Sequence, residues 1–172
     1  GESFDGNYVD DHNYSNMSLH NFTSTDAATG YYEILAGGIT KANKIIVDLG
    51  GDNAKPAVVA PARAMRAFFH FILMDSYGDI PILNKIPSDS DIIERQPRAA
   101  VTRFIVDELK DIIPYLSSAS DASTYGKPNR WMAEALLAKI YLNWPVYTAK
   151  SVDQYDANNY TNDKLDSVVY YC

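Results

Sequence analysis

Apolar side chains recur at alternating intervals of three and four residues through most of the chain, and this spacing limits the fold more than any other feature. The first series lies between residues 31 and 50 and consists of Leu35, Ile39, Ala42, Ile46 and Leu49. Positions with this spacing share one face of a helix, so an amphipathic helix with one buried stripe is predicted. Gly50-Gly51 supply its stop signal, and Gly37-Gly38 inside it predict close approach by a neighbouring helix.

The segment Pro61–Tyr77 is apolar almost all round and predicts a buried helix that ends at Gly78. It is short for a membrane span, and Arg63, Arg66 and His70 interrupt it. These polar side chains must be satisfied inside the protein, because an unpaired buried charge costs several kcal/mol, on the order of the whole stability of a domain.

Three more helical patterns follow. The first starts at Pro97 and runs to Leu116, with Val101, Ile105, Leu109 and Ile112 as its apolar stripe. The second is rich in alanine, covers residues 129 to 143 and ends at Trp144-Pro145. The third begins at Asn162 and continues to Cys172 without a stop signal. No strand of useful length is predicted, so the fold class is all-α, built from helical hairpins. Residues 1–29, 79–96 and 117–128 are predicted to be irregular, and connections of this length are often functional.

Charge and cysteine content exclude several classes of protein. The 172-residue chain carries a net charge of −7, and its first forty residues contain no Lys or Arg, so a nucleic-acid partner is not expected. Cys172 is the only cysteine, which excludes an intrachain disulfide and a cysteine metal cluster. Motifs for nucleophilic catalysis, phosphate binding or a metal site are absent from the sequence, so neither an enzyme nor a cofactor is predicted.

Several polar residues allow a functional and a structural interpretation. Arg63 and Arg66 suit a clamp for a carboxylate or sulfate, but pairing with Asp75, Asp79 or loop carbonyls is favoured. Asn43, beside the first apolar stripe, is predicted to be a satisfied core amide, and His70 a core histidine rather than a metal ligand. Asp75 and Asp79 as a glycosidase pair, and the acids of residues 5–11 as a calcium loop, are both disfavoured by their context.

The N-terminal segment differs in character from the helices. Aromatic residues alternate there with amides and carboxylates, from Phe4 to Tyr32. Aromatic rings suit the flat C–H faces of sugars, while amides and carboxylates suit their hydroxyl groups. The segment therefore fits a neutral glycan, although a surface arm whose rings only attach it to the helices fits the composition equally well.

Four blocks of sequence, taken together, carry a resemblance to a known family. They are Tyr31-Tyr32-Glu33-Ile34 with Ala42-Asn43, then Arg63-Ala64-Met65-Arg66-Ala67-Phe68-Phe69 with Tyr77-Gly78-Asp79-Ile80-Pro81, then Arg95 with the Val101–Leu116 helix, and Gly126-Lys127 before Ala133–Leu142. Over residues 30–172 the chain resembles the N-terminal portion of the SusD/RagB family of outer-membrane nutrient-binding lipoproteins. The family usually has Trp at the place of Tyr31 and Arg at the place of Lys127.

The resemblance implies a tetratricopeptide-like α-helical domain over residues 30–172, preceded by the irregular segment 1–29, as a fragment of a longer chain. It implies a cell-surface protein that binds glycans from starch or other polysaccharides without cleaving them, and that delivers oligosaccharides to a SusC-like TonB-dependent transporter. It also implies an outer-membrane lipid anchor on a cysteine that this chain does not contain.

The family resemblance also singles out candidate binding residues. In the family, the loop just before the first helix often contributes an aromatic ring to the ligand site. The candidates here are Tyr8, Asp11, His12, Asn13 and Tyr14. Tyr125 and Trp144 fit a partner protein equally well. A peptide-capturing member of the family, and a structural helical-repeat scaffold without a small ligand, remain alternatives.

Overall fold

The computed structural model describes residues 19–21, 23, 28–151 and 161–172, and these residues form an all-α fold, as predicted. The helices are α2 (Ala28–Asp48), α3 (Pro56–Tyr77), α4 (Arg98–Ile112), α5 (Arg130–Leu142), α6 (Trp144–Thr148) and α7 (Leu165–Tyr171), with short 3-10 turns η1 (Gly51–Asn53) and η2 (Ile113–Tyr115). No strand forms within these ranges, where the only extended pairing is an isolated antiparallel bridge between Ile80 and Gln96.

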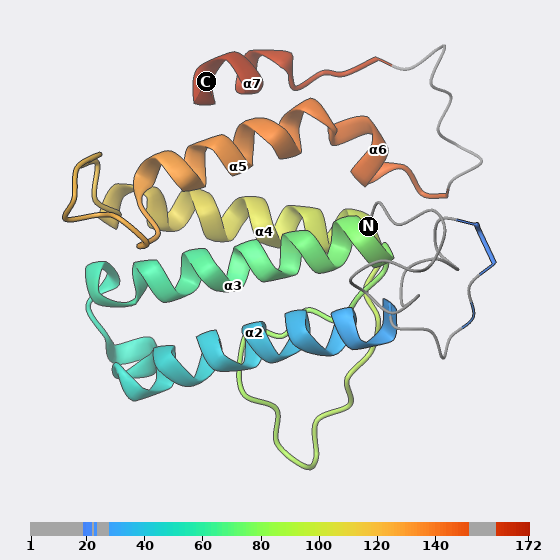
Figure 1. Ribbon diagram of the computed structural model, residues 1–172, viewed down its shortest axis with the longest axis horizontal. Coiled ribbons are helices and arrows are strands. Elements are labelled where there is room, and N and C mark those ends of the chain that lie inside the picture. Colours follow the sequence, from blue (N-terminus) through green and yellow to red (C-terminus); the bar gives the residue numbers. More distant parts are fainter. Residues whose placement is uncertain (1–18, 22, 24–27, 152–160) are drawn as a thin grey trace.

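The longer helices lie side by side in chain order, each running opposite to the one before it (Figure 1). Contacts connect α2 to α3, α3 to α4, α4 to α5, and α5 to α7. The connection between α3 and α4 leaves the row, passes α2 and extends beyond it before it returns (Figure 1). Helical hairpins are therefore the unit of the architecture. The longest described connection passes alongside the first hairpin, which consists of α2 and α3.

The core is centred on α3, which packs between α2 and α4. Ile39, Leu73, Ile105 and Leu137 from four successive helices are all at most 1% exposed. Among the described residues, α3 is the one helix long and apolar enough to cross a membrane, but it is half buried inside the fold. It is the core helix of this bundle, in agreement with the sequence interpretation.

Helix α2 buries Leu35, Ile39 and Ala42, as its apolar spacing predicted, whereas Leu49 lies beyond the end of the helix and is 42% exposed. The predicted close approach occurs at Gly38. A Cβ atom there would lie 2.9 Å from ring atoms of Phe69 on α3, so any side chain at position 38 would force the ring to move. Gly37 has no such neighbour within 4 Å.

The start of α3 was wrong in the sequence analysis by more than a turn. The helix begins at Pro56 and contains Pro61, the residue expected to begin it. Pro56 occupies the first helical position, where a missing N–H is tolerated, whereas Pro61 lies inside the helix. The earlier start buries Val59 and Ala60 against the bundle. Burial therefore outweighed the backbone hydrogen bond that Pro61 cannot donate.

Proline and asparagine set the other helix ends. Pro114 cannot donate to an α-helical carbonyl, and α4 accordingly tightens into η2 after Ile112. The side chain of Asn129 caps α5 by accepting from the backbone N–H of Met132 at 3.0 Å. Helix α5 ends before Trp144 as predicted, but a new short helix, α6, starts there instead of a loop.

Candidate functional site

The candidate residues Tyr8, Asp11, His12, Asn13 and Tyr14 lie outside the described residues. Their role in sugar binding therefore stays a prediction. The described part of the chain offers a second candidate site in the connection between α3 and α4, a segment predicted from the sequence to be irregular and of a length typical of functional loops.

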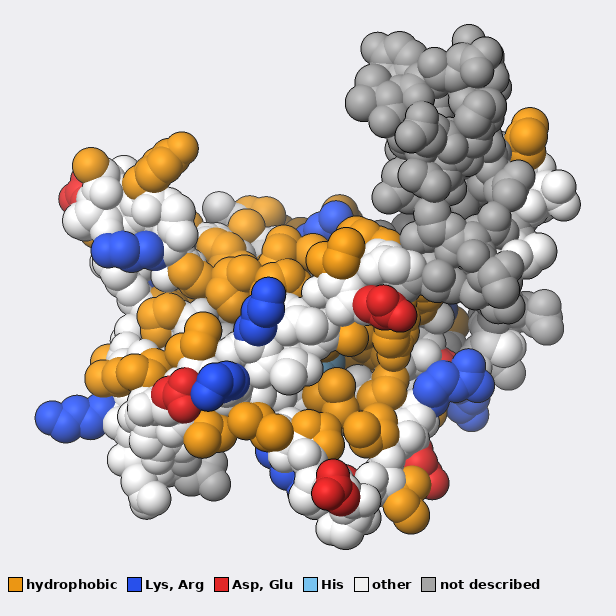
Figure 2. Space-filling model, turned by 60° about the horizontal axis from the view of Figure 1, so that its bottom comes forward, with side chains coloured by type: hydrophobic (Ala, Val, Ile, Leu, Met, Phe, Trp, Pro, Cys, Tyr) orange, Lys and Arg blue, Asp and Glu red, His pale blue; other side chains and the backbone are white. Residues whose placement is uncertain are grey.

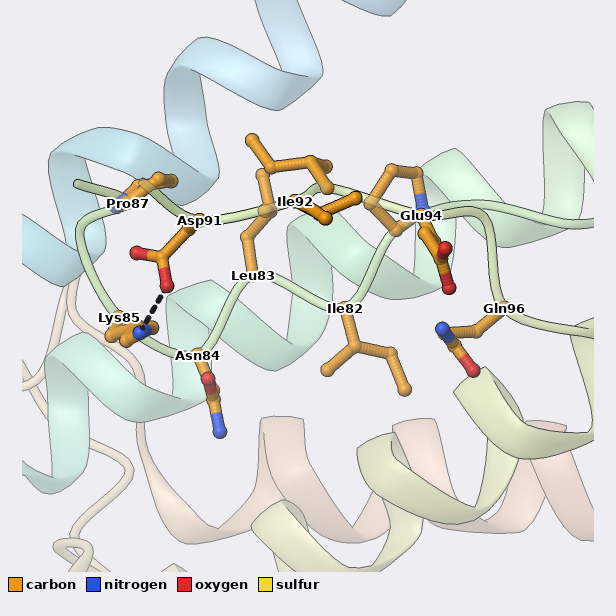
Figure 3. Close-up of a pocket in the computed structure, with 11 residues that line it drawn as sticks. Ile82, Leu83, Asn84, Lys85, Pro87, Asp91, Ile92, Glu94 and Gln96 are labelled. Carbon is orange, nitrogen blue, oxygen red and sulfur yellow. Dashed lines mark hydrogen bonds and ion pairs between the residues drawn. The ribbon is translucent and has the colours of Figure 1, made fainter. Parts of the chain in front are cut away.

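This connection, which we call the 79–97 loop, folds into two arms that run side by side (Figure 3). At its base the backbone N–H of Gln96 donates to the carbonyl of Ile80 at 2.9 Å. At its tip the Lys85 ammonium donates to the Asp91 carboxylate at 2.8 Å. The loop is thus closed at both ends, and a pocket of about 290 Å³ lies along it.

The pocket combines apolar and hydrogen-bonding side chains, including Ile82, Leu83, Asn84, Glu94 and Gln96. Its volume is near the lower end of small-molecule sites, roughly 300 to 1,000 Å³. A lining that combines amide and carboxylate groups with isoleucine and leucine side chains matches a ligand that has both hydroxyl groups and C–H faces. A sugar unit is such a ligand.

Asp91 fixes the tip of the loop. Its carboxylate accepts from the backbone N–H of Ser88 at 2.7 Å and from the Ser88 hydroxyl at 2.9 Å, in addition to Lys85. The hydrogen bond from Lys85, followed by those from Ser88, lowers the pKa of Asp91 to about 2. At neutral pH the Asp91 carboxylate is therefore ionised, and its hydrogen bonds hold the turn at the tip of the loop.

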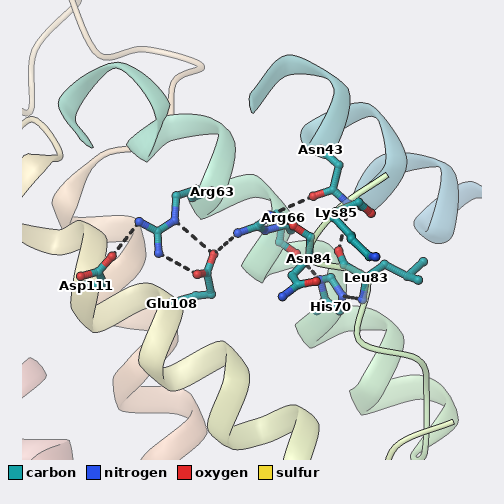
Figure 4. A network of polar contacts seen from close by, with 9 residues as sticks. All are labelled: Asn43, Arg63, Arg66, His70, Leu83, Asn84, Lys85, Glu108 and Asp111. Carbon is teal, nitrogen blue, oxygen red and sulfur yellow. Dashed lines mark hydrogen bonds and ion pairs between the residues drawn. The ribbon is translucent and has the colours of Figure 1, made fainter. Parts of the chain in front are cut away.

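Beneath the loop, a polar network connects α3 to α4 (Figure 4). Glu108 accepts from Arg63 at 2.7 Å and from Arg66 at 2.6 Å, and Arg63 also pairs with Asp111 at 2.6 Å. Burial opposes ionisation of Glu108, but the hydrogen bonds and positive charges of the two arginines outweigh it and lower its pKa. Both guanidinium groups are thus neutralised inside the protein, which leaves no clamp for an external anion.

The expected partners of the arginines were only partly right. Arg66 does bind a loop carbonyl, that of Asn84 at 2.7 Å, but neither arginine pairs with Asp75 or Asp79. Asp75 instead accepts from the Tyr147 hydroxyl at 2.7 Å. Asp79 accepts from the backbone N–H of Arg98 at 2.8 Å and thereby caps α4. Each carboxylate thus has a structural partner, and neither lines the pocket.

Asn43 and His70 occupy the core positions predicted for them, at 2% and 0% exposure. Nδ1–H of His70 donates to the Arg66 carbonyl at 2.8 Å, and its Nε2 accepts from the backbone N–H of Leu83 at 3.1 Å. Desolvation lowers the pKa of His70 to about 4, so the ring is neutral at pH 7. A neutral ring is what this pair of hydrogen bonds requires.

Glu108, which joins the two arginines, was not predicted from the sequence. The signal was present, because Glu108 stands beside Leu109 of the apolar stripe while α3 carries two arginines that need a partner. The polar residues of the 79–97 loop, Asn84, Glu94 and Gln96, were not predicted either. Nothing in their spacing predicts that the two arms meet.

A second hollow lies between α5 and α7 and is bounded by aromatic rings. It has a volume of about 720 Å³ and is lined by Trp131, Tyr170 and Tyr171. The indole N–H of Trp131 donates to the Ser118 carbonyl at 2.8 Å, which fixes its ring. Of the two residues considered for a partner protein, Tyr125 is 92% exposed, whereas Trp144 packs on Tyr141 with ring centroids 5.7 Å apart.

The face that carries α2 has an apolar surface. Figure 2 shows hydrophobic side chains spread over the side that is at the bottom of Figure 1. A shallow hollow of about 330 Å³ between α2 and α3 is lined by Ile34, Ile45, Met65 and Phe69. Within the described ranges, His, Cys, Asp and Glu do not form a group of three or more that could hold a metal ion.

Comparison with known proteins gives consistent results. A sequence model of the SusD-like family, described as starch-binding and associating with the outer membrane, matches residues 3–142. A SusD-like protein of Bacteroides ovatus is 26% identical over 140 residues, which cover 76% of this chain and 25% of the relative. The chain therefore spans about a quarter of the length of that curated relative.

Solved structures share the fold. A crystal structure with xylogluco-oligosaccharide is 25% identical, with a TM-score of 0.74 over 92% of this chain and 31% of the other. A laminarin-binding SusD-like protein is 21% identical, with a TM-score of 0.70 over 82% of this chain and 32% of the other. A SusD-like carbohydrate-binding protein from Bacteroides fragilis is 22% identical, with a TM-score of 0.63 over 76% of this chain and 27% of the other.

Proposed function

This chain belongs to the SusD-like family, and from that premise we propose that it binds an oligosaccharide without cleaving it. The observation that carries the proposal is the family match over residues 3–142, because the matched family is described as starch-binding. The related structure with xylogluco-oligosaccharide and the laminarin-binding relative support a glycan as the ligand.

The 79–97 loop supplies a part of the proposed site. Asn84 and Gln96 bring amide groups to the pocket, and Glu94 brings a carboxylate. Such groups exchange hydrogen bonds with water for hydrogen bonds with sugar hydroxyls, so the net gain from each is small and the affinity is modest. The proposed mechanism is retention of the glycan, with no bond broken.

The N-terminal segment supplies the other part of the proposed site. Tyr8 and Tyr14 would stack on sugar rings, while Asp11, His12 and Asn13 would bind their hydroxyl groups. The reason is the composition of the segment, which combines aromatic rings with neutral and acidic hydrogen-bonding groups and contains no Lys or Arg.

Location and partner follow from the family. The SusD-like family is described as associating with the outer membrane. Within this proposal the protein is held at the cell surface by a lipid on a cysteine outside this chain, and it passes its ligand to a SusC-like TonB-dependent transporter. Co-purification of the transporter with the full-length protein tests the partnership, and recovery of the protein without a transporter argues against it.

Calorimetric titration tests the binding function. Starch, xyloglucan and laminarin oligosaccharides are titrated into the protein, with a peptide pool in parallel. Heat from at least one glycan, with no new reducing ends released, is the expected result. Heat from peptides alone would favour the peptide-capturing alternative, silence from both would favour a scaffold, and released product would show an enzyme.

Substitutions locate the site. Tyr8→Ala and Tyr14→Ala are each expected to weaken glycan binding about fivefold or more, as loss of an anchoring aromatic does. Tyr125→Ala is the matched control, because this tyrosine is 92% exposed and lies in a different loop. Equal affinities for all three variants would remove the N-terminal segment from the site.

A further inference from the structure

The inner arm of the 79–97 loop is held by side chains from the helices beneath it. Nδ2 of Asn43, on α2, donates to the carbonyl of Leu83 at 2.9 Å and to that of Lys85 at 3.0 Å. These two carbonyls lie on either side of Asn84, whose side chain lines the pocket. One buried amide group thus fixes the backbone around a pocket residue.

Two side chains of α3 complete the attachment. Nη1 of Arg66 donates to the carbonyl of Asn84 at 2.7 Å, and Nε2 of His70 accepts from the backbone N–H of Leu83 at 3.1 Å. Together with the contacts of Asn43, four backbone groups in three consecutive loop residues bind three buried side chains (Figure 4). Within the described ranges, the Ile80–Gln96 bridge at the base is the only strand-like pairing of this arm, so side chains rather than a sheet hold residues 83–85.

The attachment is itself fixed from a third helix. Glu108 on α4 binds Nη2 of Arg66 at 2.6 Å, while Nη1 of the same guanidinium binds Oδ1 of Asn43 at 2.9 Å. A guanidinium is planar and presents its N–H groups in a rigid fork, so the positions of Glu108 and Asn43 determine where it can meet the loop. The path of the inner arm is therefore set by α2, α3 and α4 together.

The outer arm has fewer fastenings. Among the described residues it is tied to the inner arm at the Ile80–Gln96 bridge and at the Lys85–Asp91 pair, and Ile92 between these points is 85% exposed. The inner arm is thus positioned by the core, and the outer arm is positioned by its contacts with the inner arm. Displacement of the inner arm moves both.

We propose that Asn43, Arg66 and His70 are positioning residues that set the affinity of the loop pocket for glycan without touching the glycan. This inference rests on the proposed function, because it assumes that the pocket binds sugar. If the arm occupies its attached position for only a tenth of the time, the apparent affinity falls about tenfold. The buried contacts keep that fraction close to one.

The decisive variant is Asn43→Asp, which has almost the same shape. It keeps an oxygen for Arg66 but places a second oxygen, in place of the donor Nδ2, against the carbonyls of Leu83 and Lys85. Amide hydrogen exchange is expected to become faster at Leu83 and to stay unchanged at Leu109 in α4. Titration with xyloglucan, laminarin and starch oligosaccharides is expected to show an affinity about tenfold lower for whichever of them binds.

Asn84→Ala is the matched control, since it removes a side chain of the pocket and leaves the backbone carbonyl that Arg66 binds. It is expected to weaken glycan binding without faster exchange at Leu83. If Asn43→Asp does not fold, Arg66→Lys replaces it, because lysine keeps a cation beside Glu108 but lacks the fork that reaches both Asn43 and the loop.

Each outcome supports the inference or overturns it. Faster exchange at Leu83 together with weaker glycan binding supports it. Faster exchange with unchanged affinity overturns the positioning role and leaves the proposed function standing, and unchanged exchange overturns the attachment itself. If the unaltered chain binds none of the three glycans, the proposed function fails, and the inference falls with it whatever the exchange shows.

Discussion

Two long irregular connections that the structure describes in full, the 79–97 loop and the segment 117–129, are held in different ways. In the first, Asn43 binds the Leu83 carbonyl across 40 residues of sequence. In the second, the N–H of Ser123 donates to Asp121 two residues away, and the Thr124 hydroxyl lies within hydrogen-bond distance of the carbonyls of Ala119 and Asp121.

The second connection does contact α5, but only the first turn of that helix, which directly follows it in sequence. The N–H of Arg130 donates to the Ser117 carbonyl at 2.9 Å, and the indole N–H of Trp131 donates to Ser118 at 2.8 Å. These contacts join the start of the connection to the helix that follows it. Length therefore does not decide how firmly a connection is fixed. What decides is whether buried polar groups from distant helices bind its backbone.

Arg66→Met tests this contrast with the largest expected effect. The substitution leaves Asn43 Oδ1 and the Asn84 carbonyl without their donor and removes one of the two cations of Glu108. Removing one partner of a buried pair costs about 3 kcal/mol or more. Urea unfolding is expected to show that loss of stability. Relative to the unaltered protein, the rate of amide exchange should increase more in residues 82–85 than in residues 119–125.

Arg130→Met is the matched control, because its ion pair with Glu134 is exposed and lies next to the second connection. Its effect on stability is expected to be clearly smaller than that of Arg66→Met. Equal losses from the two variants would show that the buried network is no more important than a surface pair.

Acid pH is expected to act on the first connection with the next largest effect. Because the pKa of His70 is about 4 in the folded protein and 6.5 in the unfolded chain, the unfolded state binds more protons between these values. Stability therefore falls as the pH is lowered from 6.5 to 4, by about 3 kcal/mol in total for this group. Glu108, whose folded pKa is lowered, adds a further loss below its ordinary value of 4.5.

Urea unfolding of the wild type and of His70→Gln at several pH values checks this prediction. The difference in unfolding free energy between the two proteins should shrink between pH 6.5 and pH 4, because only the wild type has a histidine at position 70 that takes up a proton on unfolding in this range. A constant difference over that range would show that His70 does not titrate with a lowered pKa.

The smallest effect is expected for Thr124→Val in the second connection. The substitution removes a hydroxyl that interacts only with carbonyls three and five residues away. The loss of stability is expected to be at most about 1 kcal/mol, the usual net value of one hydrogen bond. Glycan titration should be unchanged, and a loss as large as that of Arg66→Met would mean that this connection also depends on the core.

The sequence predicted the helices well because their signal is local. Val101, Ile105, Leu109 and Ile112 are all buried in α4, as their spacing required. Asn43 and His70 were correctly predicted to be satisfied core residues, since a buried polar group needs partners whatever they are. The α3 start was wrong because two prolines offered equivalent local signals and burial chose between them.

The candidate site was less predictable, for a physical reason. A guanidinium reaches several ångströms from its backbone, so Arg66 could have met Asp75, Asp79 or a loop carbonyl, and spacing alone does not rank them. Helix packing made the choice, because Glu108 lies on the face of α4 that packs against α3 and there pairs with Arg66. Likewise the pocket lies along two arms of one loop, and the inner arm is bound by the Asn43 amide group, which is 40 residues away from Leu83 in the sequence.

The sequence by itself determined which segments are helical, which faces they bury and to which family the chain is similar. These properties depend on the order of residues within a few turns and on motifs read in a row. Tertiary structure alone decided the partners of the arginines and the path of the 79–97 loop. Both depend on which distant polar groups meet once the helices have packed, and hydrogen bonds act only over about 3 Å.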